Sequence, residues 1–202
     1  MIGITETWLG PSVIHPVIHG YEVVSRLDRP CASVGMQHHG GIIMYRRVLG
    51  MPISHVSDSK VAERAWFVAH AISGPYLIGL WYRPPGSDRD MIKSLDSEIG
   101  ELAIGCVGII IVGDMNIYQK RWIRLIPSNS VEGSMLQDIC AKHNLRQMVD
   151  KPTHGQYTID LTLTSTASAV RTSICGKIAD HEGVSVHVTL LVIEDEQFQR
   201  EV

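Results

Sequence analysis

The chain has 202 residues, of which 45% are apolar and 19% are charged, with a formal net charge of −3. This length suits one domain with a sizeable core. The net charge excludes a globally basic nucleic-acid-binding domain, so binding of nucleic acid would need a local basic patch. No apolar run approaches the roughly 20 residues of a membrane-spanning helix, and we expect no membrane partner. The cysteines have neither zinc-ligand spacing nor the density of a disulfide framework. We expect all four to be reduced core residues of an intracellular protein: Cys31, Cys106, Cys140 and Cys175.

Strand patterns dominate the first half of the chain. Ile2 and Ile4 indicate one face of a strand that ends near Glu6. Further strands are predicted over residues 21–24, 42–46, 61–72 and 76–82, with loops over 11–20 and 28–35. The last two strands are separated by Ser-Gly-Pro, which has hairpin turn chemistry.

The second half adds two helices. Met91, Leu95, Ile99 and Leu102 recur at helical spacing, so we predict a helix over residues 88–102. The other elements expected here are a strand over 107–112, a helix over 130–143, strands over 157–163 and 184–193, and a polar tail over 194–202. Strands outnumber helices and several form adjacent hairpins, which favours an α+β fold of two packed sheets with helices outside. Residues 1–193 are assigned to this single domain.

The apolar run from Val107 to Val112 predicts a strand buried on both faces. It ends at Gly113 and delivers Asp114 and Asn116, and a carboxylate at the end of a buried strand is costly unless it has a partner. Polar residues recur at other predicted strand ends, namely Glu6, Tyr82, Asp160, Asp180 and His181. Hard oxygen ligands without clustered cysteine or histidine favour Mg²⁺ over Zn²⁺, and the set as a whole suits hydrolysis.

Each of these residues also has a structural reading. Asp114 could cap a strand end, Glu6 could be a solvated surface residue, and Tyr82 could pack in the core. Asp160 within an apolar strand is harder to explain without a partner. The joint occurrence of these residues carries the functional interpretation.

Six blocks of sequence resemble one known family. They are ETWL (6–9), GGIIMYRR (40–47), WYRPPG (81–86), IVGDMN (111–116), PTH with TIDLTLTS (152–165) and ADHEGVSVHV (179–188). In this order they resemble the endonuclease/exonuclease/phosphatase family, in particular the apurinic-endonuclease-like domain of non-LTR (LINE-type) retrotransposons. The resemblance implies a four-layer α/β/β/α sandwich of the DNase I type and Mg²⁺-dependent phosphodiester hydrolysis, with Mn²⁺ as a substitute.

The resemblance also implies roles for single residues. Glu6 resembles the metal-binding glutamate and Asp180 the aspartate near the metal. Asp114 resembles the residue that activates water, and Asn116 the one that orients phosphate or water. The remaining matches are Tyr82 as a phosphate contact, His181 as the ligand of the scissile phosphate, and Asp160 as the residue that orients this histidine.

In retrotransposons such a domain nicks double-stranded chromosomal DNA, and the freed 3′-hydroxyl primes reverse transcription. The resemblance therefore implies a DNA substrate, a reverse-transcriptase module on a parent polyprotein, and a nuclear location inferred from the substrate. Lys120, Arg121, Trp122 and Arg124 suit phosphate contacts and base stacking, although a solvated loop with Trp122 in the core is an equal alternative.

Two departures from the family pattern leave other functions open. The chain starts at the family's second motif, so we expect the first strand to be missing, and Ala179 replaces the usual serine. One alternative is a catalytically impaired remnant that only binds nucleic acid or protein. Another is a phosphatase that acts on a small molecule or lipid, since the family includes such enzymes.

Overall fold

The computed structural model describes residues 1–29 and 40–189. The elements in chain order are β1 (Ile2–Thr5), β2 (Tyr21–Leu27), β3 (Ile42–Arg47), β4 (Ile53–Asp58), β5 (Glu63–Ala71), β6 (Gly74–Tyr82), α1 (Asp90–Leu102), β7 (Gly108–Asp114), α2 (Val131–Lys142), β8 (Arg146–Gln147), β9 (Asp160–Thr164), β10 (Val170–Ile178) and β11 (His181–Val188). Predicted residues 190–193 and the tail 194–202 lie outside the described residues, as does Cys31.

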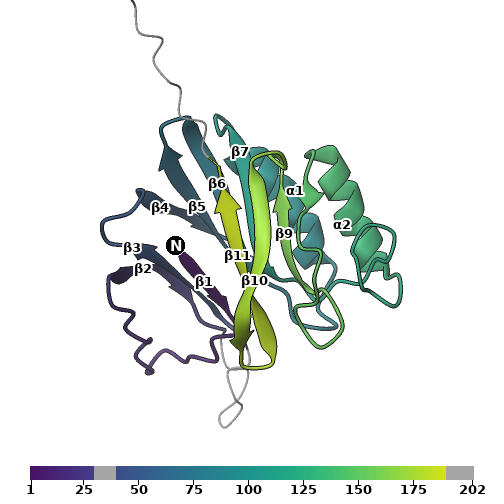
Figure 1. Cartoon of the computed structure of the whole chain (residues 1–202), viewed down its shortest axis with the longest axis horizontal. Helices are drawn as coiled ribbons and strands as arrows, with labels where there is room; N and C mark the ends of the chain where they lie inside the picture. Colours follow the sequence, from purple (N-terminus) through teal and green to yellow (C-terminus); the bar gives the residue numbers. More distant parts are fainter. Residues whose placement is uncertain (30–39, 190–202) are drawn as a thin grey trace, which may run out of the picture.

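A six-stranded mixed sheet has the order β4-β5-β6-β7-β9-β8. The pairing of β6 with β7 is parallel, and the crossover that a parallel pair requires is made through α1. Ile92, Leu95 and Ile99 form the buried stripe of α1 and pack against this sheet. Figure 1 shows α1 and α2 on one side of the sheet and β1, β2 and β3 on the other.

Alternate residues of the central strands enter two different cores. Trp66 of β5 and Ile111 of β7 belong to the core beneath the helices, whereas Phe67 and Ile110 belong to the core between the sheets. This alternation confirms that the strand predicted over 107–112 is buried on both faces. The core between the sheets also receives side chains from β2, β3, β10 and β11.

The layer that faces the six-stranded sheet is made of two antiparallel sheets, β1-β3-β2 and β10-β11. Gly3 of β1 packs against Leu80 of β6, where a Cβ would lie 2.8 Å from the Leu80 side chain. The α+β sandwich is therefore confirmed. Within the described ranges both helices cover the six-stranded sheet, and the helix layer that the α/β/β/α order expects outside the other strands is not observed there.

The sequence patterns did not predict three of the strands, one of which is the two-residue β8. β4 is a mostly exposed strand at the edge of the sheet, and β10 is mostly exposed and polar, so neither has a strong apolar pattern. β9 begins only at Asp160, because Tyr157 pairs with His154 in a turn before the strand.

Three of the four cysteines can be placed. Cys140 is buried and Cys106 is half-buried, but the prediction of a core position is wrong for Cys175, which is exposed on β10. In the described part of the chain, no helix is long and apolar enough to cross a membrane.

Candidate active site

Backbone geometry at the end of β7 sets the position of Asp114. The preceding Gly113 has φ +138°, and a Cβ there would lie 1.9 Å from the carbonyl oxygen of Trp81 in β6. Only glycine permits this conformation and this approach. The backbone N–H of Arg83 then donates to the Asp114 carbonyl at 2.8 Å, so the end of β7 is held against the segment after β6.

Asn116 holds the carboxylate of Asp114. Its backbone N–H donates to Asp114 Oδ1 at 3.1 Å, and its side-chain Nδ2 donates to Oδ2 at 2.8 Å. Nδ2 also donates to the carbonyl of Arg83 at 3.1 Å. Asn116 adopts the left-handed region with φ 46°, which asparagine tolerates better than most residues. The Asp-x-Asn spacing thus positions a buried carboxylate.

Asp160 and His181 form the second pair of the site. Asp160 begins β9 and lies opposite Asp114 in the antiparallel register of β7 and β9. Its Oδ2 lies 2.8 Å from Nδ1 of His181, the first residue of β11. This hydrogen bond, with the negative charges of Asp160 and Asp114, raises the pKa of His181 to about 9 despite partial burial. The imidazole is therefore cationic at neutral pH.

Glu6 and Tyr82 bring the N-terminal segment into the site. The Tyr82 hydroxyl donates to Glu6 Oε1. Burial, and then the hydrogen bond to Glu6, raises the pKa of Tyr82, so the phenol remains a donor. Glu6 follows β1 with φ 51°, and the Trp8 N–H donates to the Gly40 carbonyl at 2.9 Å, which anchors the segment beside β3.

Glu6, Asp114 and His181 converge. Each offers one ligand atom, and these three atoms lie within 4.8 Å of one another. Burial, followed by the charge of Asp160, raises the pKa of Asp114 to about 7, and Glu6 adds to this shift while His181 opposes it. A divalent cation would relieve this repulsion between carboxylates, and the oxygen donors of Glu6 and Asp114 suit a hard ion such as Mg²⁺.

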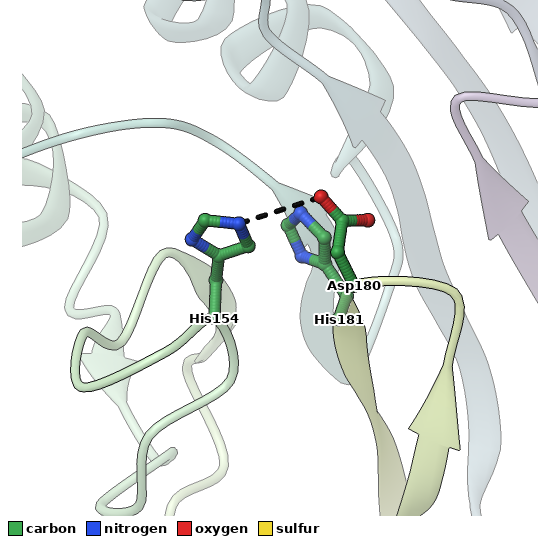
Figure 2. A group of neighbouring side chains, drawn as sticks. All are labelled: His154, Asp180 and His181. Carbon is green, nitrogen blue, oxygen red and sulfur yellow. Dashed lines mark ion pairs between the residues drawn. The ribbon is translucent and has the colours of Figure 1, made fainter.

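Asp180 belongs to a different group of side chains. It lies with His154 and His181, and the ligand atoms of these three also lie within 4.8 Å of one another. His154 Nε2 is 3.5 Å from Asp180 Oδ2 (Figure 2). The two predicted metal ligands, Glu6 and Asp180, thus fall in two groups that share His181.

His154 was given no role from the sequence. It lies in the PTH block, one of the stretches of sequence that resemble the family. Its neighbourhood depends on a β-bridge between His154 and His181, residues that are far apart in the chain. That PTH block is the only signal in the sequence that pointed to it.

The residues predicted to contact nucleic acid lie in the segment between β7 and α2. Lys120, Arg121 and Arg124 are exposed, whereas Trp122 is half-buried and packs against the core beneath the helices. Trp122 therefore packs on the core, as the alternative interpretation of a solvated loop predicts. Arg83 is buried and donates to the Asn116 carbonyl at 3.3 Å.

The family described as endonuclease-reverse transcriptase matches residues 76–189, a range that includes all the predicted catalytic residues and Asp180, but not Glu6. No curated protein matches the sequence.

Many solved structures have similar folds, including the three that follow. The endonuclease domain of TRAS1, a telomere-specific non-LTR retrotransposon, has a TM-score of 0.58 and 14% identity, with 86% of this chain and 82% of that chain covered. The 3′ phosphatase NExo from Neisseria, bound to product DNA hairpin, also has a TM-score of 0.58 and 14% identity, with coverage of 92% and 87%. Cytolethal distending toxin from Actinobacillus actinomycetemcomitans has a TM-score of 0.55 and 13% identity, with coverage of 93% and 85%. These likenesses establish the DNase I-like fold.

Proposed function

The chain belongs to the endonuclease-reverse transcriptase family, a branch of the endonuclease/exonuclease/phosphatase proteins, and on this premise we propose that it is a Mg²⁺-dependent DNA endonuclease. The proposed reaction is the nicking of one strand of double-stranded target DNA by hydrolysis of a phosphodiester bond. The observation that carries this proposal is the convergence of Glu6, Asp114 and His181, whose ligand atoms lie within 4.8 Å of one another.

Asp114 is the proposed general base. The raised pKa of its carboxyl places it close to neutral, where a carboxylate takes a proton from water more readily than an ordinary aspartate does. Asn116 donates to both carboxylate oxygens and keeps the base in one orientation. The attacking water loses its proton to Asp114 as its oxygen bonds to phosphorus. The bond from phosphorus to the 3′-oxygen breaks, and the leaving 3′-oxygen takes a proton from solvent to become the free 3′-hydroxyl.

His181 is the proposed partner of the scissile phosphate. Its Nδ1 is held by Asp160, which leaves Nε2–H free to donate to a non-bridging phosphate oxygen. Because the imidazole is cationic, it stabilises the negative charge that grows on the phosphate in the transition state. Tyr82 is a further donor, once its hydroxyl turns from Glu6 to the phosphate.

Glu6 offers a carboxylate ligand for the metal beside Asp114, and Asp180 offers a second carboxylate next to His181. When bound, Mg²⁺ supplies positive charge that polarises a phosphoryl oxygen and stabilises the leaving oxygen. Mn²⁺, which also prefers carboxylate oxygen, is the expected substitute.

DNA is the proposed substrate because exposed cations lie close in sequence to the catalytic residues. Lys120, Arg121 and Arg124 follow Asn116 within eight residues and are free of the core. An open cavity of about 280 Å³ is lined by Asn116 and Tyr118, among others. In a retrotransposon the nick would supply the 3′-hydroxyl for a reverse transcriptase on the same polyprotein, and we propose a nuclear location from this substrate.

A plasmid-nicking assay tests the proposal. Conversion of supercoiled to open-circular DNA is expected with Mg²⁺ and not with EDTA, and Asp114→Ala should abolish it. Asp138→Ala removes an exposed carboxylate of α2 and is the matched control. Absence of metal-dependent nicking, with DNA binding retained, would instead support the impaired remnant. Hydrolysis of a small phosphomonoester without nicking would support the phosphatase.

A further inference from the structure

His154, Asp180 and His181 form a cluster beside the proposed catalytic residues. Figure 2 shows His154 and Asp180 turned toward each other, with the ring of His181 next to them. His154 Nε2 and Asp180 Oδ2 are 3.5 Å apart, and the two imidazole ring centres are 4.6 Å apart. Three side chains with metal-ligand atoms thus meet at one place.

The backbone holds these side chains together. His154 and His181 form an antiparallel β-bridge, and the Glu182 N–H donates to the Thr153 carbonyl at 2.7 Å. Asp180 immediately precedes β11 and therefore moves with His181. Two ligands from one segment and one from a segment bonded to it make a largely preformed site.

The hydrogen bond from His181 to Asp160 is one that metal-binding histidines commonly make. Asp160 occupies Nδ1 at 2.8 Å, so Nε2 is the nitrogen that remains for a ligand. Histidines that bind metals commonly bond a carboxylate through the other ring nitrogen, which sets the tautomer and strengthens the ligand. The negative charges of Asp160 and Asp180 favour a cation bound at this place.

The donor set selects the class of ion. Two imidazoles and one carboxylate match Zn²⁺ and similar transition metals, whereas Mg²⁺ prefers oxygen donors alone. The ligand atoms of the three side chains lie within 4.8 Å of one another. Because a zinc–ligand bond is about 2.1 Å long, the side chains must move closer together to bind the ion. The side chains of His154 and Asp180 are 42% and 73% exposed, so both are free to close around an ion.

We propose that His154, Asp180 and His181 form a binding site for a Zn²⁺-type transition-metal ion, and that its occupation inhibits the enzyme. His181 belongs to both groups, and an ion on Nε2 replaces the proton that His181 would donate to a phosphate oxygen. The inhibition rests on the proposed nuclease function, whereas the binding site does not.

Metal binding is measured first, without DNA and without catalysis. Metal-stripped protein is titrated with Zn²⁺ by calorimetry and with Co²⁺ by visible absorption. One tight Zn²⁺ site is expected in the wild type, and both His154→Ala and His154→Gln should weaken it by about 10-fold or more. His187→Ala removes an exposed histidine of β11 and is the matched control, with unchanged affinity expected. Zinc-induced shifts of the His154 and His181 ring nitrogens in NMR spectra should locate the ion.

Inhibition is measured next, by Zn²⁺ titration of nicking in excess Mg²⁺. Because His154 takes no part in the proposed reaction, His154→Ala should nick like the wild type without zinc and need about 10-fold more Zn²⁺ for half inhibition. Zinc affinity in both His154 variants within two-fold of the wild type would overturn the site, whether or not the protein nicks DNA. A wild type that binds Zn²⁺ through His154 but nicks at full rate when saturated would overturn the inhibition.

Discussion

Asp114 and Asp160 lie directly opposite each other where β7 pairs with β9, so two carboxylates share one end of a buried sheet. Asp160 raises the pKa of Asp114, and His181, which bonds Asp160, lowers it. The three side chains form one electrostatic unit. A change at one of them should therefore be measurable at the others.

The variant Asp160→Asn tests this coupling. The pKa of His181 should fall from about 9 toward its ordinary value of 6.5, because the hydrogen bond and charge that favour the imidazolium are removed. Nicking should drop by about 10²-fold or more, the usual contribution of a positioned acid or base. Histidine ring-proton titration by NMR measures the first effect, and an unchanged His181 pKa would contradict the pairing.

Gly113→Ala should destabilise the fold. A Cβ at Gly113 would lie 1.9 Å from the Trp81 carbonyl oxygen, and the φ of +138° is unfavourable for alanine. The expected loss is about 3 kcal/mol or more in the free energy of unfolding. Gly100→Ala is the control, because a Cβ there meets no atom within 4 Å and the site is helical, so a gain of about 0.5–1 kcal/mol is expected. Urea denaturation measures both, and equal stabilities would refute the close approach.

Acid should weaken the ion pair between Glu98 of α1 and Arg64 of β5 by protonating Glu98. Burial alone would raise the pKa of Glu98, but hydrogen bonds and charge from Arg64, with bonds from Ser59 and Trp66, lower it below 4.5. The folded state thus holds the proton less tightly than the unfolded chain. This stabilisation is complete above pH 4.5 and is lost as the pH falls through the lower, folded-state pKa.

Glu98→Gln should remove that part of the acid dependence. It should also cost about 2 kcal/mol at neutral pH, because the fully buried Arg64 loses a charged hydrogen-bond partner at 2.8 Å. Urea unfolding curves between pH 3 and 7 are the measurement. An identical slope of stability against pH in wild type and Glu98→Gln would rule out this role.

The exposed cations after Asn116 should govern the salt dependence of DNA binding. Replacing Lys120, Arg121 and Arg124 by alanine should reduce the slope of log affinity against log salt by about 0.9 for each DNA phosphate that the protein no longer neutralises. Fluorescence anisotropy with duplex DNA in EDTA over a salt series gives this slope. The matched control replaces three exposed lysines elsewhere, namely Lys60, Lys93 and Lys142. A control that lowers the slope equally would point to a diffuse charge effect.

Much of this protein could be predicted from local patterns. The strand before Asp114 and the helix with Leu95 were predictable, because continuous apolar runs and helical spacing directly reflect burial. β4 and β10 were not, since edge and exposed strands carry little apolar signal. The burial of Cys175 and Trp122 was also not predictable, because residue type alone does not determine whether a side chain is buried or exposed.

The sequence by itself determined which chemistry this protein holds: carboxylates, an amide, a phenol and an imidazole at the ends of strands, in the order of one known family. Only the tertiary structure decided how they are grouped. Strand register sets Asp114 against Asp160, and the bridge between His154 and His181 draws Asp180 into a group apart from Glu6. The physical reason is that ligand and proton chemistry depends on distances of a few ångströms between residues remote in the chain, and those distances follow from pairing and packing.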